Sequence, residues 1–301
     1  MRAESDRLDR ATNDTVRRDG RFINFIGQAA MTDTLRIDNL ARSAEAARPT
    51  ILRARGIGRS FRGLHALADY NLDLQEGDIL GVIGPNGAGK TTLFNVLTGF
   101  IAPTSGSIDF LGKDITGLSP DRVVRLGMAR TFQNIRLFSR MTVLDNVKTA
   151  QQLRGNVGFL ETLWSFPTFR RKERDLEERA TDHLRALGLD NFRDVVATSL
   201  PYGFQRKLEI ARALATGPKV LLLDEPAAGM NAQETTELTA FIRQLHGHYG
   251  LTIVVVEHDM SLIMKLCERI QVLNYGRIIA EGTPVEIRNN PAVIEAYLGV
   301  E

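Results

Sequence analysis

Residues 84–92 combine residue types at a spacing that suits the binding of a phosphate chain; they read Gly-Pro-Asn-Gly-Ala-Gly-Lys-Thr-Thr. Glycines let backbone N–H groups turn toward an anion, the Lys90 ammonium can reach the outer phosphates of a nucleoside triphosphate, and the Thr91 hydroxyl can bind Mg²⁺. The sequence therefore predicts a triphosphate site made of Gly84, Pro85, Asn86, Gly87, Ala88, Gly89, Lys90, Thr91 and Thr92.

The segments on either side of this stretch have the structure that such a loop requires. Residues 79–83, Ile-Leu-Gly-Val-Ile, form a short apolar run typical of a parallel strand buried on both faces. Residues 92–97 begin an amphipathic helix, and the N-terminus of a helix offers roughly half a positive charge and free N–H donors. This order of strand, glycine loop and helix favours a phosphate site over an ordinary glycine-rich turn.

Two further apolar runs end in side chains suited to phosphate chemistry. Residues 220–223 are followed by Asp224 and Glu225, and residues 251–256 are followed by Glu257 and His258. Ligands of an open α/β sheet bind at the carboxyl ends of its strands. A lone histidine or an exposed Asp-Glu pair is usually structural, but here three strand ends agree. We therefore expect residues 84–92, the pair Asp224-Glu225 and His258 to converge on one ligand.

Two other residues could contact a nucleotide. Gln133, in the polar and basic stretch 127–138, carries an amide that could bind Mg²⁺ or the attacking water, although an isolated glutamine would be unremarkable. Phe61 lies upstream of the phosphate loop, and an aromatic ring there could stack on adenine, a contact worth about 1 kcal/mol. A core position is an equally good interpretation of Phe61.

The composition is that of a globular, enzyme-sized protein. The chain has 301 residues, of which 43% are hydrophobic, enough for one large domain or two modest ones. A formal net charge of +2 is too balanced to indicate a nucleic-acid partner. The single cysteine, Cys267, cannot form an internal disulfide, and no apolar run is long enough to span a membrane, so a cytosolic protein fits best.

The chain divides into an extension and a folded domain. Residues 1–48 mix both charge signs without a lasting apolar period, which predicts a largely disordered extension, whether translation begins at Met1 or Met31. Residues 49–301 are predicted to fold, with strands at 51–55, 70–74 and 106–110 and a helix at 200–215. A helical insertion is predicted at about 139–200, most clearly at 170–187, where four apolar residues share one face: Leu176, Ala180, Leu184 and Leu187.

Over about residues 51–300 these motifs resemble, in order, those of the ATP-binding subunits of ABC transporters. The phosphate loop of that family is similar to residues 84–91, and its apolar strand with Asp-Glu is similar to residues 220–225. Its glutamine loop corresponds to Gln133, its switch histidine to His258, and its adenine-stacking aromatic to Phe61.

Two segments depart from the family pattern. The Leu-Ser-Gly-Gly-Gln segment of the family aligns with residues 200–204, Leu-Pro-Tyr-Gly-Phe, which keep only Leu200 and Gly203. The family's aspartate in the loop after the catalytic carboxylates is Asn231 here. Both departures concern contacts between two subunits and not ATP binding. Residues 129–138, 225–231 and 287–291 look like the branch that imports branched-chain amino acids, whose near relatives handle urea or amides.

The resemblance implies an α/β fold: a P-loop NTPase core, with a mostly parallel sheet and an antiparallel β edge, and an inserted helical subdomain. It implies ATP and Mg²⁺ as cofactors. Thr91 and Gln133 would bind the Mg²⁺ ion, and Asp224 would support it through a water molecule. Glu225 would be the base that deprotonates the attacking water, and His258 would contact the γ-phosphate. Leu200 and Gly203 would face the ATP of a second subunit.

The partners implied by the resemblance are transmembrane permease subunits, a second ATP-binding subunit that is the same or different, and indirectly a periplasmic or extracellular substrate-binding protein. The chain would then lie on the cytoplasmic face of the membrane and bind no nucleic acid. Two alternatives stay open. One is a soluble ABC protein that acts on DNA or ribosomes, and the other is a catalytically weak regulatory subunit, which Pro201 and Asn231 favour.

Deletion of residues 1–48 tests the predicted extension. Because this stretch lacks the apolar periodicity needed to pack on a core, the shortened chain should keep its melting temperature and its ATPase rate nearly unchanged. Thermal melts and steady-state ATP hydrolysis of both chains measure this. A large loss of either quantity would mean that the extension packs or signals.

Overall fold

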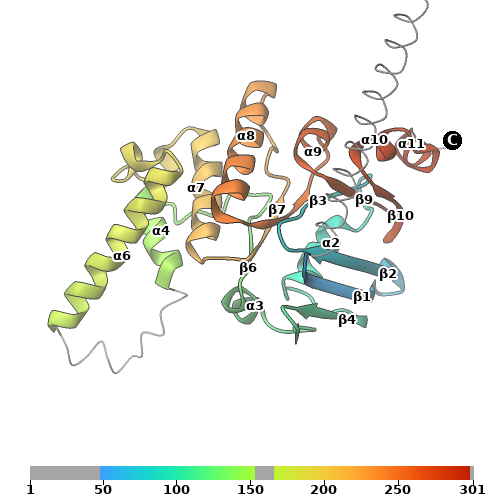
Figure 1. Ribbon diagram of the computed structural model, residues 1–301, viewed down its shortest axis with the longest axis horizontal. Coiled ribbons are helices and arrows are strands. Elements are labelled where there is room, and N and C mark those ends of the chain that lie inside the picture. The colour runs from blue at the N-terminus through green and yellow to red at the C-terminus, as the bar shows by residue number, and fades with distance from the viewer. Residues whose placement is uncertain (1–47, 153–165, 299–301) are drawn as a thin grey trace, which may run out of the picture. The chain divides into compact units, whose positions relative to one another are not determined.

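The computed structural model describes residues 48–152 and 166–298, and the fold is that of the second of two units, Thr50–Glu301. The predicted extension lies outside the described residues except for its last position. Figure 1 shows one large sheet flanked by helices, with a smaller sheet beside it.

The large sheet has six strands in the order β10-β9-β3-β8-β7-β6. Five strands run parallel, and the edge strand β10 is antiparallel to β9. Every residue of β3, β7 and β8 is buried, which confirms the interpretation of the three apolar runs. The strands are β3 (Ile79–Ile83), β6 (Met128–Arg130), β7 (Val220–Asp224), β8 (Thr252–Val256), β9 (Arg269–Asn274) and β10 (Arg277–Gly282).

The small sheet is antiparallel, with strands in the order β2-β1-β4-β5: β2 (Leu64–Gln75), β1 (Thr50–Phe61), β4 (Ser105–Phe110) and β5 (Lys113–Asp114). The sequence predicted two short strands with a polar stretch between them, but β1 and β2 form one long hairpin. The turn residues Arg62 and Gly63 both have positive φ, the backbone of a tight hairpin turn. The other glycines between the predicted strands lie at irregularities in the strand pairing. Gly56, with φ 59°, is at such a shift in register.

Two cores pack on opposite faces of the large sheet because side chains alternate along each strand. Leu221 and Leu223 of β7 face the core that is covered by helices, whereas Val220 and Leu222 face the core shared with the small sheet. The first core is covered by α7 (Tyr202–Ala215), α8 (Ala232–Tyr249) and α9 (Met260–Leu266), and the second by α2 (Lys90–Leu97) and α3 (Pro120–Leu126).

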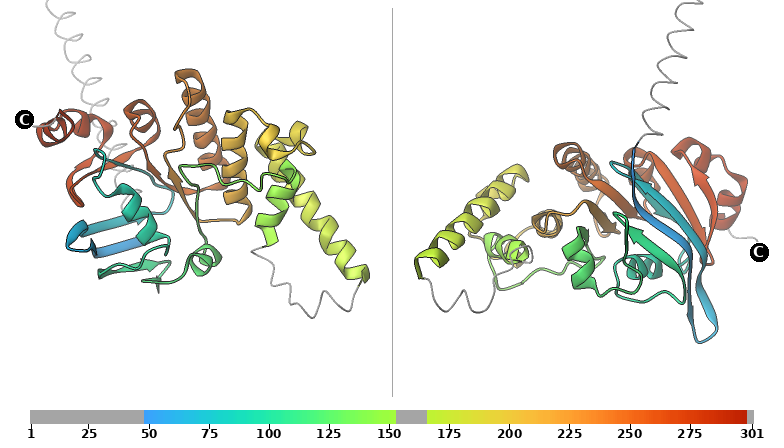
Figure 2. Two further views of the ribbon diagram at one scale, coloured as in Figure 1. Left: turned by 180° about the vertical axis from the view of Figure 1, so that it is seen from behind. Right: turned by 60° about the horizontal axis from the view of Figure 1, so that its bottom comes forward.

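Between β6 and α7 the described residues form the helices α4 (Val143–Gln151) and α6 (Phe166–Ala186) and the short 3-10 helices η2 (Asp190–Phe192) and η3 (Ala197–Ser199). Ala180 and Leu184 are fully buried, as the predicted apolar face requires. The views in Figure 2 agree that α4 and α6 lie on the far side of α7 from the small sheet. The chain then ends in α10 (Pro284–Arg288) and α11 (Pro291–Leu298). In the described part of the chain no helix is both long and apolar enough to cross a membrane.

A buried hydrogen bond between the sheets gives a test of the fold. The Tyr70 hydroxyl of β2 donates to the Gln271 amide oxygen of β9 at 2.6 Å, and both side chains are buried. Tyr70→Phe leaves that oxygen without its donor, so the free energy of unfolding should fall by about 1–3 kcal/mol. Urea unfolding measures the loss. An unchanged midpoint would show that the bond contributes nothing.

Candidate nucleotide-binding and hydrolysis site

The phosphate loop connects β3 to α2 through backbone that only glycine adopts easily. Gly89 has φ 108° at the N-cap of α2, and a Cβ there would collide with the Ala66 carbonyl oxygen. Gly84 is equally confined, since a Cβ would collide with the Leu273 carbonyl oxygen. The loop is therefore fixed by its neighbours, and α2 directs its N-terminal N–H groups toward it.

Lys90 lies across the loop that it terminates. Its ammonium donates to the carbonyl oxygens of Gly84 at 2.6 Å and Pro85 at 3.0 Å. Burial holds the pKa of Lys90 below its usual value, and the nearby carboxylates of Glu225 and Asp224 only partly oppose this effect. The ammonium is thus held in the loop that follows β3, and it donates to two backbone oxygens whose place phosphate oxygens could take.

Asp224 ends β7 and forms an ion pair with Arg130, which ends the neighbouring strand β6. The guanidinium Nη2 lies 2.6 Å from the carboxylate, and both side chains are almost fully buried. Arg130 also donates to the Asn95 amide oxygen of α2 at 2.7 Å. Sequence reasoning did not assign a role to Arg130; its place within the stretch 127–138, three residues before Gln133, was the only local signal.

Glu225 is the point where the predicted catalytic residues meet. The Gln133 amide nitrogen lies 2.8 Å from Glu225 Oε2, and His258 Nδ1 lies 3.6 Å from the same oxygen. The Glu225 N–H donates to the Val256 carbonyl at the end of β8. Its φ of 44° is in the left-handed region, a strain that costs on the order of 1 kcal/mol and is typical of functional sites. Three residues far apart in the sequence therefore converge.

Glu257 is a second residue that sequence reasoning did not assign. It is fully buried, and its carboxylate accepts N–H bonds from Ala227 at 2.7 Å, His258 at 3.0 Å and Asp259 at 3.3 Å. Burial raises the pKa of Glu257, and these N–H bonds oppose that rise. Its contacts tie the turn after Glu225 to the turn that carries His258. The signal was its place at the end of an apolar strand.

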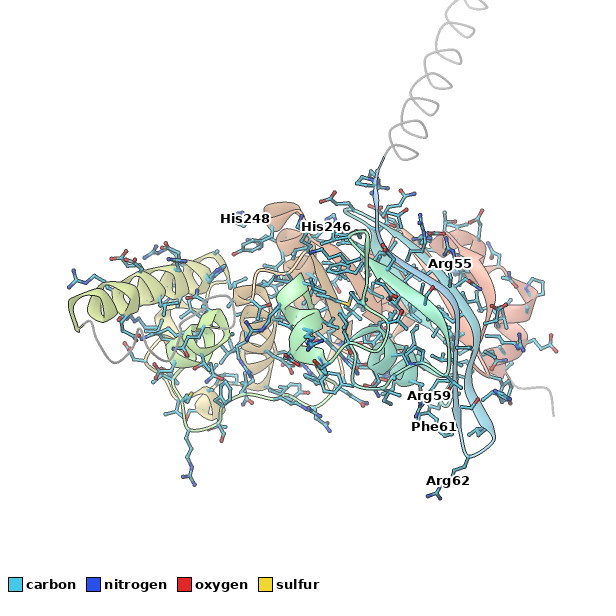
Figure 3. All side chains as sticks on the ribbon, turned by 90° about the horizontal axis from the view of Figure 1, so that it is seen from below. Arg55, Arg59, Phe61, Arg62, His246 and His248 are labelled. Atoms are coloured by element: carbon cyan, nitrogen blue, oxygen red, sulfur yellow. The ribbon has the colours of Figure 1, made fainter. Side chains whose placement is uncertain are left out.

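Phe61 is not a core residue, because 39% of it is exposed at the end of β1. The Arg59 guanidinium lies 4.6 Å from the centre of its ring. Figure 3 shows Arg59, Phe61 and Arg62 together toward the tip of the hairpin. One face of the ring is therefore engaged by a cation.

The residues that replace the family's Leu-Ser-Gly-Gly-Gln segment start α7. Leu200 is buried, whereas Gly203 has open space around it. The Phe204 ring packs 4.8 Å from Phe192, and the Tyr202 hydroxyl donates to the Ala228 carbonyl at 2.9 Å. Asn231 caps α8 by accepting two backbone N–H bonds. Phe204, Tyr202 and Asn231 thus each have a local structural role.

With this geometry in view, comparison with known proteins decides the family. The model of the family described as ABC transporter matches residues 67–228, more than half of the chain. The chain belongs to the ABC transporter family. A second model, described as branched-chain amino acid ATP-binding cassette transporter, matches residues 277–301 of this cassette.

The cassette is similar to curated proteins over most of their length. It is 47% identical to the high-affinity branched-chain amino acid transport ATP-binding protein BraF of Pseudomonas aeruginosa over 249 residues, which are 83% of this chain and 98% of the relative. The corresponding protein LivG of Escherichia coli is 46% identical over the same shares. The crystal structure of the ADP conformation of MJ1267, an ATP-binding cassette of an ABC transporter, superposes with a TM-score of 0.73 at 32% identity, covering 83% of this chain and 99% of that one.

These matches confirm the predicted α/β cassette fold and its assignment as an ATP-binding ATPase. The individual site residues and their roles stay predictions, because no comparison reports on them. What the structure adds is their placement: Gln133, Glu225 and His258 lie in contact distance at the ends of β6, β7 and β8, beside the Lys90 ammonium.

Gly89→Ala tests the phosphate loop. The new Cβ must displace the Ala66 carbonyl or the start of α2, so ATP binding should weaken by about tenfold or more, a loss of roughly 1.4 kcal/mol. Gly188→Ala is the control, because Gly188 also has positive φ but open space around it. Calorimetric titration with ATP measures both variants. Equal affinity of the two would mean that the close packing of Gly89 is irrelevant to binding.

Proposed function

We propose that this chain is the ATP-hydrolysing subunit of an importer for branched-chain amino acids or related amides. The convergence of Gln133 and His258 on Glu225 carries the hydrolytic part of the proposal. The names of the relatives and the match of residues 277–301 support the substrate class.

The phosphates of ATP would be held by the backbone N–H groups of the loop and by Lys90, in place of the two carbonyls that it now contacts. The donors proposed for Mg²⁺ suit that ion, because Thr91, Gln133 and Asp224 supply oxygen ligands. The Gln133 amide nitrogen is the group bonded to Glu225, so its oxygen can serve the metal. Bound Mg²⁺ would neutralise charge that develops on the transferred phosphoryl group.

Glu225 would accept the proton of the attacking water. Its backbone is left-handed where the chain leaves β7, the Gln133 amide donates to one of its two oxygens, and the His258 ring lies 3.6 Å from the same oxygen. His258 would also contact the γ-phosphate. Arg130 neutralises Asp224 beside this group, which limits the repulsion between two adjacent carboxylates.

Permease subunits would dock at a groove of about 570 Å³ that is lined by Arg136, Leu137, Phe138 and Arg212. A second ATP-binding subunit, the same or different, would present its phosphate loop to Gly203 and the N-terminus of α7. The chain would thus act on the cytoplasmic side of the membrane, with a substrate-binding protein as an indirect partner. We also propose residues 49–301 as the cassette and about 139–200 as its helical subdomain.

Glu225→Gln tests the proposed base. The amide keeps the shape of the side chain but cannot accept the proton, so the ATPase rate should fall by about 10²–10⁴-fold while ATP still binds. Single-turnover hydrolysis and nucleotide titration separate the two effects. A rate within about threefold of the parent, far short of that loss, would exclude Glu225 as the base.

Uptake by cells tests the transport role. Cells that lack this chain should lose uptake of labelled leucine, isoleucine or valine and regain it with the parent chain but not with Glu225→Gln. Labelled urea and a small aliphatic amide, assayed in parallel, distinguish the neighbouring substrate classes. The tagged chain should also co-purify with membrane-spanning subunits from detergent extracts. Unchanged uptake of every solute would contradict the import function.

A further inference from the structure

Two charged residues on α7 form a pair that is buried beside the segment carrying Gln133. Arg206 Nη1 lies 3.0 Å from Glu209 Oε2, one turn apart on the helix. Their side chains are only 1% and 5% exposed. We call Arg206 and Glu209 the α7 brace, and residues 132–136 the glutamine loop.

The brace holds the backbone of the glutamine loop through both of its charges. Arg206 donates to the carbonyl oxygens of Phe132 at 2.8 Å and Gln133 at 2.6 Å. Glu209 Oε1 accepts from the N–H groups of Phe132 and Arg136, each at 3.3 Å. Four backbone groups of a segment with no regular secondary structure thus have their partners on a single helix.

Stability alone is a poor reason for such a pair. Removing two charges from water costs several kcal/mol, and apolar residues of similar volume often stabilise a protein equally well or better. A guanidinium and a carboxylate have an advantage that apolar residues lack, because they fix the positions of specific oxygen and N–H groups. The brace therefore suits a role in placing the glutamine loop.

The same guanidinium is linked through Tyr202 to the segment that follows Glu225. Arg206 Nη2 lies 3.2 Å from the Tyr202 hydroxyl, which in turn donates to the Ala228 carbonyl at 2.9 Å. One helix therefore contacts the chain on both sides of the 2.8 Å contact between Gln133 and Glu225. α7 also packs against α4 and α6.

We propose that the α7 brace positions Gln133 against Glu225, because it fixes the backbone that carries the Gln133 side chain. Arg206 and Glu209 are positioning residues in this proposal, with Tyr202 as the link to the loop after Glu225. The proposal rests on the function proposed above, in which Gln133 and Glu225 take part in hydrolysis.

The test replaces the whole pair, Arg206→Met together with Glu209→Met, in the full chain. Both charges leave at once, so neither is left buried without the other, but the backbone groups of the glutamine loop lose their partners and the melting temperature should fall. The rates are therefore compared at a temperature at which thermal melts show both chains to be folded. The maximal ATPase rate should fall by about tenfold or more, because small misplacements of catalytic groups are costly. The KM for ATP should change much less, since the phosphate loop is untouched.

A second substitution shows whether the effect passes through Gln133. In a chain that carries Gln133→Ala, the brace substitutions should lower the rate by less than about twofold, because residues that act as a unit are non-additive. Arg193→Met is the control. Arg193 Nη2 lies 2.9 Å from Glu177 Oε1, and this ion pair does not touch the glutamine loop. It should keep the parent rate.

Each outcome has a distinct meaning. A parent-like rate in the brace variant, or the same fold loss with and without Gln133, would overturn the positioning role. If Gln133→Ala alone kept the parent rate, the assignment of Gln133 in the proposed function would be wrong, and the positioning proposal would fall with it. Should the double variant not fold, Arg206→Lys keeps the charge but not the two-pronged donor, and the same loss of rate is expected.

Discussion

The parallel register of three short buried strands is the constraint on which the site depends. Ile79 to Val82 of β3 pair with Ile253 to Val256 of β8, and β8 pairs with β7 through Asp224 and Val256. Because parallel strands in this register end at one edge, the phosphate loop, the carboxylate pair and His258 emerge together. This register is fixed because both faces are packed. A shift of one residue would move every side chain of a strand from its own core to the core on the opposite face.

Each buried carboxylate near this edge of the sheet has its own partner. Asp224 is paired with Arg130, Glu209 with Arg206, and Glu257 with three backbone N–H groups. An unpaired carboxylate in such surroundings would take up a proton, because desolvation disfavours its charged form. Glu225 differs, since its partners are the neutral Gln133 amide and the exposed His258 ring. Of these four carboxylates, Glu225 is the one whose partners include neither an arginine nor backbone N–H groups, which suits the base proposed above.

The turns that join the strand ends are connected to one another. Glu257 ties the turn after Glu225 to the turn of His258, and α7 holds the glutamine loop from the other side. The four-stranded sheet adds a further support, since the Ala66 carbonyl lies where a side chain at Gly89 would have to fit. The phosphate loop is thus shaped as much by its neighbours as by its own glycines.

The sequence by itself determined the elements that are local. The loop at 84–92, the apolar strands and the polar residues that end them could be recognised because each feature lies within about ten consecutive residues and follows a fixed period or spacing. Only the tertiary structure decided which charges meet. Arg130 and Asp224 are 94 positions apart, and Arg206 and the Gln133 carbonyl are 73 apart. Such partners are chosen by strand order and helix packing, so no local spacing predicts them.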